Sequence, residues 1–358
     1  MDRFGVIFDA ERMKYPHTGL YHFCKQLGLA LVEENKSDES IDLQFYLSDV
    51  YDKIFGENVH YIQQKSIHKF LRPFFSKTRI WHSTYQLSSY FPRNPKTKVL
   101  STIHDLNFLK EGKSIEKERK YLKILQRNLD HSDCVVAISK YVKQDLLDHC
   151  NLNGKEIHTI YNGSNMLTYF SLDRKKIPPV NNNQQFIFTI GTVNRKKNFH
   201  VLPYLLVGNE LELVISGVVN EQGYDSHIMG IAHQLGVAER VHITGPVSEE
   251  EKYSYLRECA LFVFPSIAEG FGLPVIEAMS LGKKVLLSSY TCLPEIGGPE
   301  AFFLESTDPE YLIEFGKSHL IDIIDSEDRT NEIKDWSAQF SWDKAADEYW
   351  KLYKDLLK

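Results

Sequence analysis

The sequence has few of the residues that would cross-link the chain or anchor it. Its 358 residues include five scattered cysteines, an odd number without a C-x-x-C pair. We therefore expect no disulfide framework and no structural zinc site, and a reducing, cytoplasmic setting. No uninterrupted apolar run is long enough to span a membrane. The first nine residues lack a long apolar core with a cleavage site, so they predict a strand rather than a signal peptide.

Other absences narrow the class of protein. The net charge is −6, so the overall charge does not indicate a nucleic-acid partner. The dinucleotide fingerprint G-x-G-x-x-G is missing, which disfavours an NAD-dependent enzyme. No D-x-D element stands at the end of an expected strand. We therefore expect a chemistry that is metal-independent and uses no cofactor.

The chain does contain an alternation of short apolar runs and helical patterns from its start to its end. This alternation is typical of α/β domains with doubly wound parallel sheets. Because the runs are apolar without a polar alternation, both faces of each sheet should be covered by helices. The expected strands are 4–9, 43–47, 79–83, 98–104, 134–139 and 157–161, then 186–191, 211–217, 241–245, 261–265, 284–288 and 301–304.

Length and local composition predict two domains. A chain of 358 residues exceeds the usual size of one domain. Pro178 and Pro179, followed by three Asn, have the composition of a linker. We expect a first domain over residues 1–171, a linker over 172–185, a second domain over 186–340 and an amphipathic C-terminal helix over 341–358.

The most informative stretch runs from Pro265 to Gly282. It predicts a buried strand, a glycine-bearing loop and a helix, with Pro274 near the start of the helix and Gly282 at its end. Glycines let a loop backbone approach a ligand closely, and the N–H groups at a helix N-terminus favour an anion. The residues placed to meet that anion are Gly270, Phe271, Gly272 and Leu273.

Two carboxylates, Glu269 and Glu277, flank this loop. Their spacing around Gly-Phe-Gly-Leu-Pro resembles the E-x7-E motif of retaining GT-B glycosyltransferases of family 4 (GT4). An ordinary strand-to-helix turn with two incidental acids is the alternative. The resemblance implies two Rossmann-like domains that face a cleft, with the last helix crossing back onto the first domain. It places Glu269 at the donor sugar and Glu277 at the ribose.

A second motif follows the strand expected at 186–191. Three cations after a strand and a glycine, namely Arg195, Lys196 and Lys197, would meet a phosphate group well. The motif is similar to the family pattern G-T-x-x-x-R-K-N, which puts Lys197 at the diphosphate-binding lysine. Lys196 stands where arginine is more typical, and a solvated basic turn is the alternative. In the family, the loop that starts with Gly245, Pro246 and Val247 borders the nucleotide base.

The first half supplies two more candidates. Gly19 opens a helix, and the resemblance implies that it approaches the donor diphosphate, although a plain helix start explains it equally well. His104 follows a strand at its carboxyl end, where ligands bind in such sheets. A titrating histidine there could hydrogen-bond a sugar hydroxyl, as the family position implies. The alternative is a solvated histidine at a strand end.

Residues 65–81 combine cations with aromatic side chains and contain no acid. They are Lys65, Lys69, Arg72, Lys77 and Arg79, with Phe70, Phe74, Phe75 and Trp81 between them. One interpretation is a patch that makes peripheral contact with an anionic membrane, on the inner face of the plasma membrane. The other is a helix that packs its aromatics and solvates its cations.

Together the motifs predict a retaining glycosyltransferase. It would move a hexose from a nucleotide-diphosphate sugar, GDP-mannose or a UDP-sugar, to a hydroxyl of a glycan or lipid-linked acceptor. Surface polysaccharide synthesis is suggested by how common it is in the family. Two alternatives stay open, a nucleotide-sugar 2-epimerase of the same architecture and a non-catalytic nucleotide-sugar binder, because a fold does not determine a function.

Overall fold

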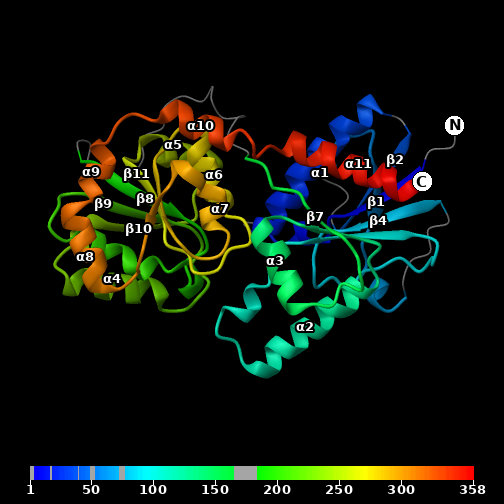
Figure 1. The fold of residues 1–358 in the computed structure, drawn as a ribbon, viewed down its shortest axis with the longest axis horizontal. Coiled ribbons are helices and arrows are strands. Elements are labelled where there is room, and N and C mark those ends of the chain that lie inside the picture. Colours follow the sequence, from blue (N-terminus) through cyan, green and yellow to red (C-terminus); the bar gives the residue numbers. More distant parts are fainter. Residues whose placement is uncertain (1–3, 17, 39, 49–52, 72–76, 165–183) are drawn as a thin grey trace. The chain divides into compact units, whose positions relative to one another are not determined.

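The computed structural model describes residues 4–16, 18–38, 40–48, 53–71, 77–164 and 184–358 (Figure 1). The chain forms two compact units, which are treated separately below. Unit 1 comprises Met1–Gly163 and Phe340–Lys358, and unit 2 comprises Ser164–Gln339. The units therefore divide before the expected linker at 172–185. Most of that linker lies outside the described residues, so it stays a prediction.

Unit 1 is built on a seven-stranded parallel sheet with the order β3-β2-β1-β4-β5-β6-β7. The strands are β1 (Phe4–Asp9), β2 (Ile41–Leu47), β3 (His60–Gln63), β4 (Thr78–Ser83), β5 (Lys98–Ile103), β6 (Cys134–Ala137) and β7 (Ile157–Thr159). Six of them confirm the sequence prediction to within two residues at each end. The edge strand β3 was missed, because its four residues are exposed or half-buried and lack an apolar run.

Helices lie on both faces of this sheet (Figure 1). The helices of unit 1 are α1 (Gly19–Ser37), α2 (Ile115–Asp130), α3 (Lys140–His149) and α11 (Trp342–Leu357). The C-terminal helix α11 packs on α1 and β4. Hydrogen bonds fasten it there: the His82 ring Nδ1 lies 2.6 Å from the Tyr353 hydroxyl, and Thr102 Oγ1 lies 2.9 Å from the Tyr349 hydroxyl. The last helix therefore belongs to the first unit.

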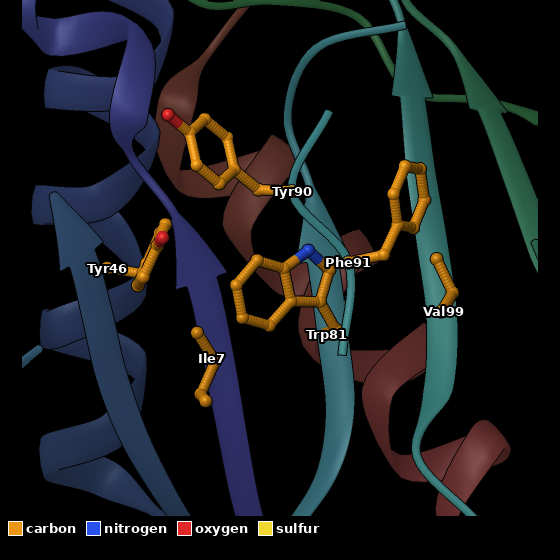
Figure 2. Packing of buried hydrophobic residues seen from close by; sticks show 6 residues of the cluster. All are labelled: Ile7, Tyr46, Trp81, Tyr90, Phe91 and Val99. Carbon is orange, nitrogen blue, oxygen red and sulfur yellow. The ribbon is translucent and has the colours of Figure 1, made fainter. Parts of the chain in front are cut away.

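The opposite face of the same sheet is covered differently. Successive side chains of a strand alternate between faces, so Ile7, Tyr46 and Trp81 point away from α1. There they form a buried cluster with Tyr90 and Phe91, which come from the loop after β4 (Figure 2). A loop covers this part of the sheet, and α2 lies over the same face, where Asn128 donates to the carbonyls of Gln86 and Ser88 in that loop. With α1 and α11 on the other face, helices therefore lie on both faces, as the sequence predicted (Figure 1). Trp81 lies fully in the core, so it is not part of a surface patch.

Unit 2 contains a six-stranded parallel sheet with the order β10-β9-β8-β11-β12-β13. Its strands are β8 (Phe186–Ile190), β9 (Glu212–Ser216), β10 (Val241–Gly245), β11 (Leu261–Phe264), β12 (Val285–Ser288) and β13 (Phe302–Leu304), all predicted. Its helices are α4 (Tyr224–Gln234), α5 (Glu249–Glu258), α6 (Leu273–Ser280), α7 (Leu293–Gly297), α8 (Pro309–Ser318), α9 (Leu320–Asp325) and α10 (Thr330–Ser337). The strand order reverses between β8 and β11, the point at which such sheets bind ligands.

No helix within the described ranges combines the length and the apolar character that crossing a bilayer requires.

The buried His82 makes the stability of unit 1 sensitive to pH. Burial lowers the pKa of His82 from 6.5 to about 3, so protonation favours the unfolded chain. We expect this contribution to stability to disappear as the pH falls below 6.5. The free energy of unfolding should fall by about 1.4 kcal/mol more per pH unit in the wild type than in His82→Gln. Urea unfolding at pH 7, 6 and 5 measures this difference, and equal slopes would contradict it.

Candidate functional site

The predicted strand, loop and helix around Glu269 are present in unit 2. β11 ends at Phe264, and α6 begins at Leu273. Gly272 precedes the helix with φ at +96°, a conformation that side chains rarely adopt, and a Cβ there would lie 3.1 Å from Leu293 Cδ2. Gly282 follows the helix at a φ of +74° and ends it. The backbone of this stretch therefore depends on its glycines, as the sequence indicated.

A buried ion pair joins the two loops at the reversal point of the sheet. Lys197, in the loop after β8, lies with Nζ 2.6 Å from Glu269 Oε1, in the loop after β11. The two side chains are only 13% and 12% exposed. Ser266 Oγ donates to the same carboxylate oxygen at 2.5 Å, and the Phe264 ring lies beneath the ammonium at 4.8 Å. A cation and an anion of the predicted site are thus direct partners.

The protonation equilibria of this pair follow from its burial. Burial by itself would raise the pKa of Glu269, but the charges of Lys197 and Lys196 outweigh it and lower that pKa. Burial lowers the pKa of Lys197 more than Glu269 raises it. The carboxylate is therefore firmly ionised. The lysine is a partly dehydrated cation, which gains much from a second anion.

Main-chain and hydroxyl contacts fix the position of Glu269. The Lys196 carbonyl accepts a hydrogen bond from Ile267 N at 3.0 Å, and its oxygen lies 3.2 Å from Ser266 Oγ, whose single proton is shared with Glu269. The Glu269 N–H donates to Thr291 Oγ1 at 3.1 Å. Thr291 has a φ of +54°, a rare conformation for a β-branched residue. Three loops, after β8, β11 and β12, thus meet at Glu269, two through its carboxylate or the neighbouring backbone and one through its N–H group.

The three predicted cations have different environments. Lys197 pairs with Glu269, while Lys196 supports the neighbouring loop through its carbonyl. Arg195 turns to Glu221 instead, with its N–H 2.9 Å and its Nε 2.7 Å from the two carboxylate oxygens. Its side chain is 72% exposed. Arg195 therefore has an acidic partner outside the cluster around Glu269.

Glu277 also has a buried cationic partner, which the sequence analysis missed. Lys252 of α5 lies with Nζ 3.2 Å from Glu277 Oε1 and 2.7 Å from Glu249 Oε2. Burial raises the pKa of Glu277, and Lys252 only partly offsets this. One signal pointed to Lys252, because it stands four residues before the buried Leu256 on the same face of α5. Ser266 and Thr291 carried no comparable signal.

The predicted base-side residues follow the edge strand β10. Gly245 ends this strand with φ at +73°, and its carbonyl accepts a hydrogen bond from Gly217 N at 2.8 Å. Pro246 is exposed and Val247 half-buried. A Cβ at Gly217 would approach the Gly191 carbonyl oxygen to 1.8 Å. The carboxyl ends of β8, β9 and β10 therefore pack closely, backbone against backbone.

In unit 1, His104 packs against the ring of Phe23, a residue of the helix that Gly19 opens. His104 contacts Phe23 edge to face at 4.5 Å, and Phe23 stands four residues after Gly19 on α1. His104 is buried, its Nε2 donates to the Thr84 carbonyl at 2.8 Å, and burial lowers its pKa to about 4. The histidine is therefore neutral near pH 7, which corrects the expectation that it titrates there. Its burial also contradicts the alternative of a solvated histidine at a strand end. A Cβ at Gly19 would meet no atom within 4 Å.

Comparisons with known proteins agree with this architecture. The family Glycosyl transferases group 1 matches residues 172–334, and Glycosyltransferase Family 4 matches residues 59–166. O-antigen chain mannosyltransferase B of Escherichia coli is 24% identical, over 98% of this chain and 99% of its own length. Serotype-specific mannosyltransferase WbdA of Escherichia coli is 25% identical over 61% of this chain, which spans only 28% of WbdA.

The fold is also found among solved structures. Alr3699/HepE from Anabaena, in complex with UDP and glucose, superposes with a TM-score of 0.71 at 15% identity, covering 98% of this chain and 99% of that one. Two parallel-sheet Rossmann-like units with these strand orders form the GT-B fold. The chain belongs to the family 4 type of glycosyltransferases, whose two domain families match its two halves.

The Lys197–Glu269 pair predicts a specific pattern of stability. Lys197→Met or Glu269→Gln alone leaves one buried charge without its partner, so each should lower the free energy of unfolding by about 3 kcal/mol. The double variant should lose clearly less than the sum, because neither charge then remains. Urea unfolding of the four proteins measures the coupling. Additive losses would show that the two side chains do not stabilise each other.

Proposed function

We propose that this protein is a retaining glycosyltransferase that transfers a hexose from a nucleotide-diphosphate sugar to a hydroxyl acceptor. The observation that carries the proposal is the buried Lys197–Glu269 pair beside the start of α6, at the reversal point of the unit 2 sheet. Such a point binds nucleotides in related sheets. A cation for the diphosphate and an anion for the sugar thus stand side by side.

The leaving group of the reaction is a nucleoside diphosphate, so catalysis requires stabilisation of its growing negative charge. Lys197 has a lowered pKa and little contact with water, and a diphosphate would stabilise its ammonium form. The N–H groups at the start of α6, from Gly272 and Leu273, would add the helix-terminal contribution, with Gly270 and Phe271 shaping the approach. Lys196 would contribute positive charge nearby, and Arg195 would do so if it exchanged Glu221 for the diphosphate. These groups need no metal ion to act.

Glu269 has the complementary task at the sugar. Its carboxylate is ionised and fixed by Ser266 and Lys197, so it can stabilise positive charge that develops at the anomeric carbon. The bond from the anomeric carbon to the phosphate oxygen breaks as the bond to the acceptor oxygen forms on the same face. The acceptor proton passes to the departing phosphate oxygen. Glu269 is therefore not a glycosidase-type acid or base.

The other site residues bind the rest of the donor. Glu277 would accept hydrogen bonds from the ribose hydroxyls, and the backbone at Gly245, Pro246 and Val247 would border the base. From unit 1, Gly19 would allow the diphosphate to approach the start of α1, where a Cβ has open space. His104, neutral near pH 7, would orient the sugar by hydrogen bonding rather than as a cation.

The donor and acceptor classes are proposed from the relatives. Two curated relatives are named as mannosyltransferases, one of the O-antigen chain and one serotype-specific, which supports GDP-mannose as donor and a surface polysaccharide as product. A UDP-sugar is the second candidate, since a solved structure of the same fold contains UDP and glucose. The acceptor would be a glycan or a lipid-linked glycan, reached from the cytoplasm.

Incubation with UDP-, GDP- and ADP-sugars tests the function. We expect slow hydrolysis to the nucleoside diphosphate without acceptor, and faster transfer with one. Glu269→Ala should lower turnover at least about 100-fold, while nucleoside diphosphate binding persists. The control is Glu305→Ala, an exposed carboxylate of the same unit. Epimer formation would support a 2-epimerase, binding without turnover would support a non-catalytic binder, and an active Glu269→Ala would refute the assigned role.

Peripheral membrane contact is a further part of the proposal. Ile67, Phe70 and Leu71 are 54%, 85% and 67% exposed, with the exposed Lys65 and Lys69 among them. Apolar side chains next to cations suit an anionic lipid surface. Of the other predicted residues, Lys77 and Arg79 are exposed. Arg72, Phe74 and Phe75 lie outside the described residues.

Flotation with liposomes tests this contact. The wild type should float with vesicles that contain phosphatidylglycerol and much less with phosphatidylcholine alone, because the cations require anionic lipid. Phe70→Ser combined with Leu71→Ser should weaken binding at least about tenfold. Ile115→Ser removes another exposed apolar side chain of unit 1 and should float like the wild type. No flotation of the wild type at low salt would refute the contact.

A further inference from the structure

A buried lysine links α5 to the helix that carries Glu277. Lys252 is the fourth residue of α5, and its side chain is nearly inaccessible to water. Its ammonium contacts Glu277 at 3.2 Å and Glu249 at 2.7 Å. Glu277 is similarly buried, whereas Glu249 is partly exposed. One buried cation is thus shared by two carboxylates, one of which lies at the proposed ribose position.

This buried ion pair is expected to add little net stability to the fold. Burial of a charged pair costs much of the Coulomb energy that it gains, and an apolar pair of the same size often stabilises a core as well. A lysine near the start of a helix also stands at the positive end of the helix dipole. Lys252 therefore has a poor location for a lysine that acts only in packing, and its contact with Glu277 suggests another task.

We propose that Lys252 is a positioning residue for nucleotide recognition, which keeps the Glu277 carboxylate ionised and oriented so that it binds the two ribose hydroxyls. This inference rests on the proposed function. A carboxylate can accept a hydrogen bond from each hydroxyl of a vicinal diol. A protonated carboxyl group has one oxygen that carries a proton and donates, so it accepts less well from two hydroxyls. Hydrogen bonds to a charged acceptor are also roughly twice as strong as those to a neutral one.

The electrostatics support this task. Burial raises the pKa of Glu277, Glu249 raises it further, and Lys252 opposes both. The pKa of Lys252 is raised, because the two carboxylates outweigh its burial, so it remains a cation. Within the described residues, the charges that act on Glu277 are those of Lys252 and Glu249, both on α5. The elements that pack against α6 add no further charge there; they are β11, β12, α7 and α10. Without Lys252, Glu277 would become protonated at a higher pH.

The experiment compares nucleotides with and without the diol. Isothermal titration with UDP, GDP and ADP identifies the nucleoside diphosphate that the wild type prefers. Its affinity is then measured against that of the 2′,3′-dideoxy form, between pH 6 and 9. The ratio of the two affinities isolates the diol, because the titration of the diphosphate cancels. Variants are Lys252→Met, Lys252→Arg and Glu277→Gln.

The control is Lys284→Met, which removes a half-buried lysine of unit 2. Lys284 donates hydrogen bonds to the carbonyls of residues 323, 324 and 326 and is not part of the proposed site. We expect the wild type and Lys284→Met to prefer the ribose form by about tenfold or more, the scale of hydrogen bonds to a charged acceptor. Lys252→Met should lose most of this preference at neutral pH and recover part of it as the pH rises. Lys252→Arg should retain it.

The result also shows which hypothesis fails. If the wild type binds no nucleoside diphosphate, the proposed function and this inference are both overturned. If it binds with a clear diol preference that Lys252→Met leaves unchanged at every pH, only the role of Lys252 is overturned. The double variant gives a second test. If the losses of diol preference in Lys252→Met and Glu277→Gln add up in the double variant, Lys252 does not act through Glu277. The ratio is insensitive to a uniform loss of folded protein.

Discussion

The ion pair between Lys197 and Glu269 is the contact on which the site of unit 2 depends. It connects the loops after β8 and β11, two strands that are neighbours in the sheet but distant in the sequence. The two charges attract each other strongly because they are nearly excluded from water. For the same reason, either charge would be costly to bury without its partner. The hydrogen bonds of Ser266 and Thr291 add geometric precision. A donor diphosphate would enter an environment where a dehydrated lysine already has one anionic partner and gains from a second.

The same stretch of chain contains two carboxylates with opposite environments. The pKa of Glu269 is lowered by two lysines despite its burial, whereas the pKa of Glu277 is raised because burial exceeds the effect of Lys252. Eight residues separate them, but one lies in a loop and the other inside α6. Different surroundings give identical side chains different proton affinities, which suits the two roles proposed for them, one at a developing positive charge and the other at neutral hydroxyls. This separation is what the proposed transferase chemistry requires of the pair.

Unit 1 shows how a parallel sheet can have two unlike faces. Helices α1 and α11 cover one face, and hydrogen bonds from His82 and Thr102 fasten α11 although it comes from the other end of the chain. Tyr90 and Phe91, from a loop, close part of the opposite face over Trp81 (Figure 2). The burial that makes this core also keeps His104 neutral. Aromatic residues near each other in the sequence can therefore separate completely, with Trp81 in the core and Phe70 in solvent.

The sequence alone determined the class of fold, twelve of the thirteen strands in the described residues, and the strand, loop and helix around Glu269. These features are local: apolar runs, glycines at positive φ and helix ends depend on neighbours along the chain. The tertiary structure decided the partners. The sequence pattern does not show that Lys252 pairs with Glu277 or that Lys197 pairs with Glu269. A positive φ at Thr291 is contrary to the preference of its residue type. Charge partners and pKa values arise only when distant loops meet in a low-dielectric interior, and that meeting is not encoded in any local pattern.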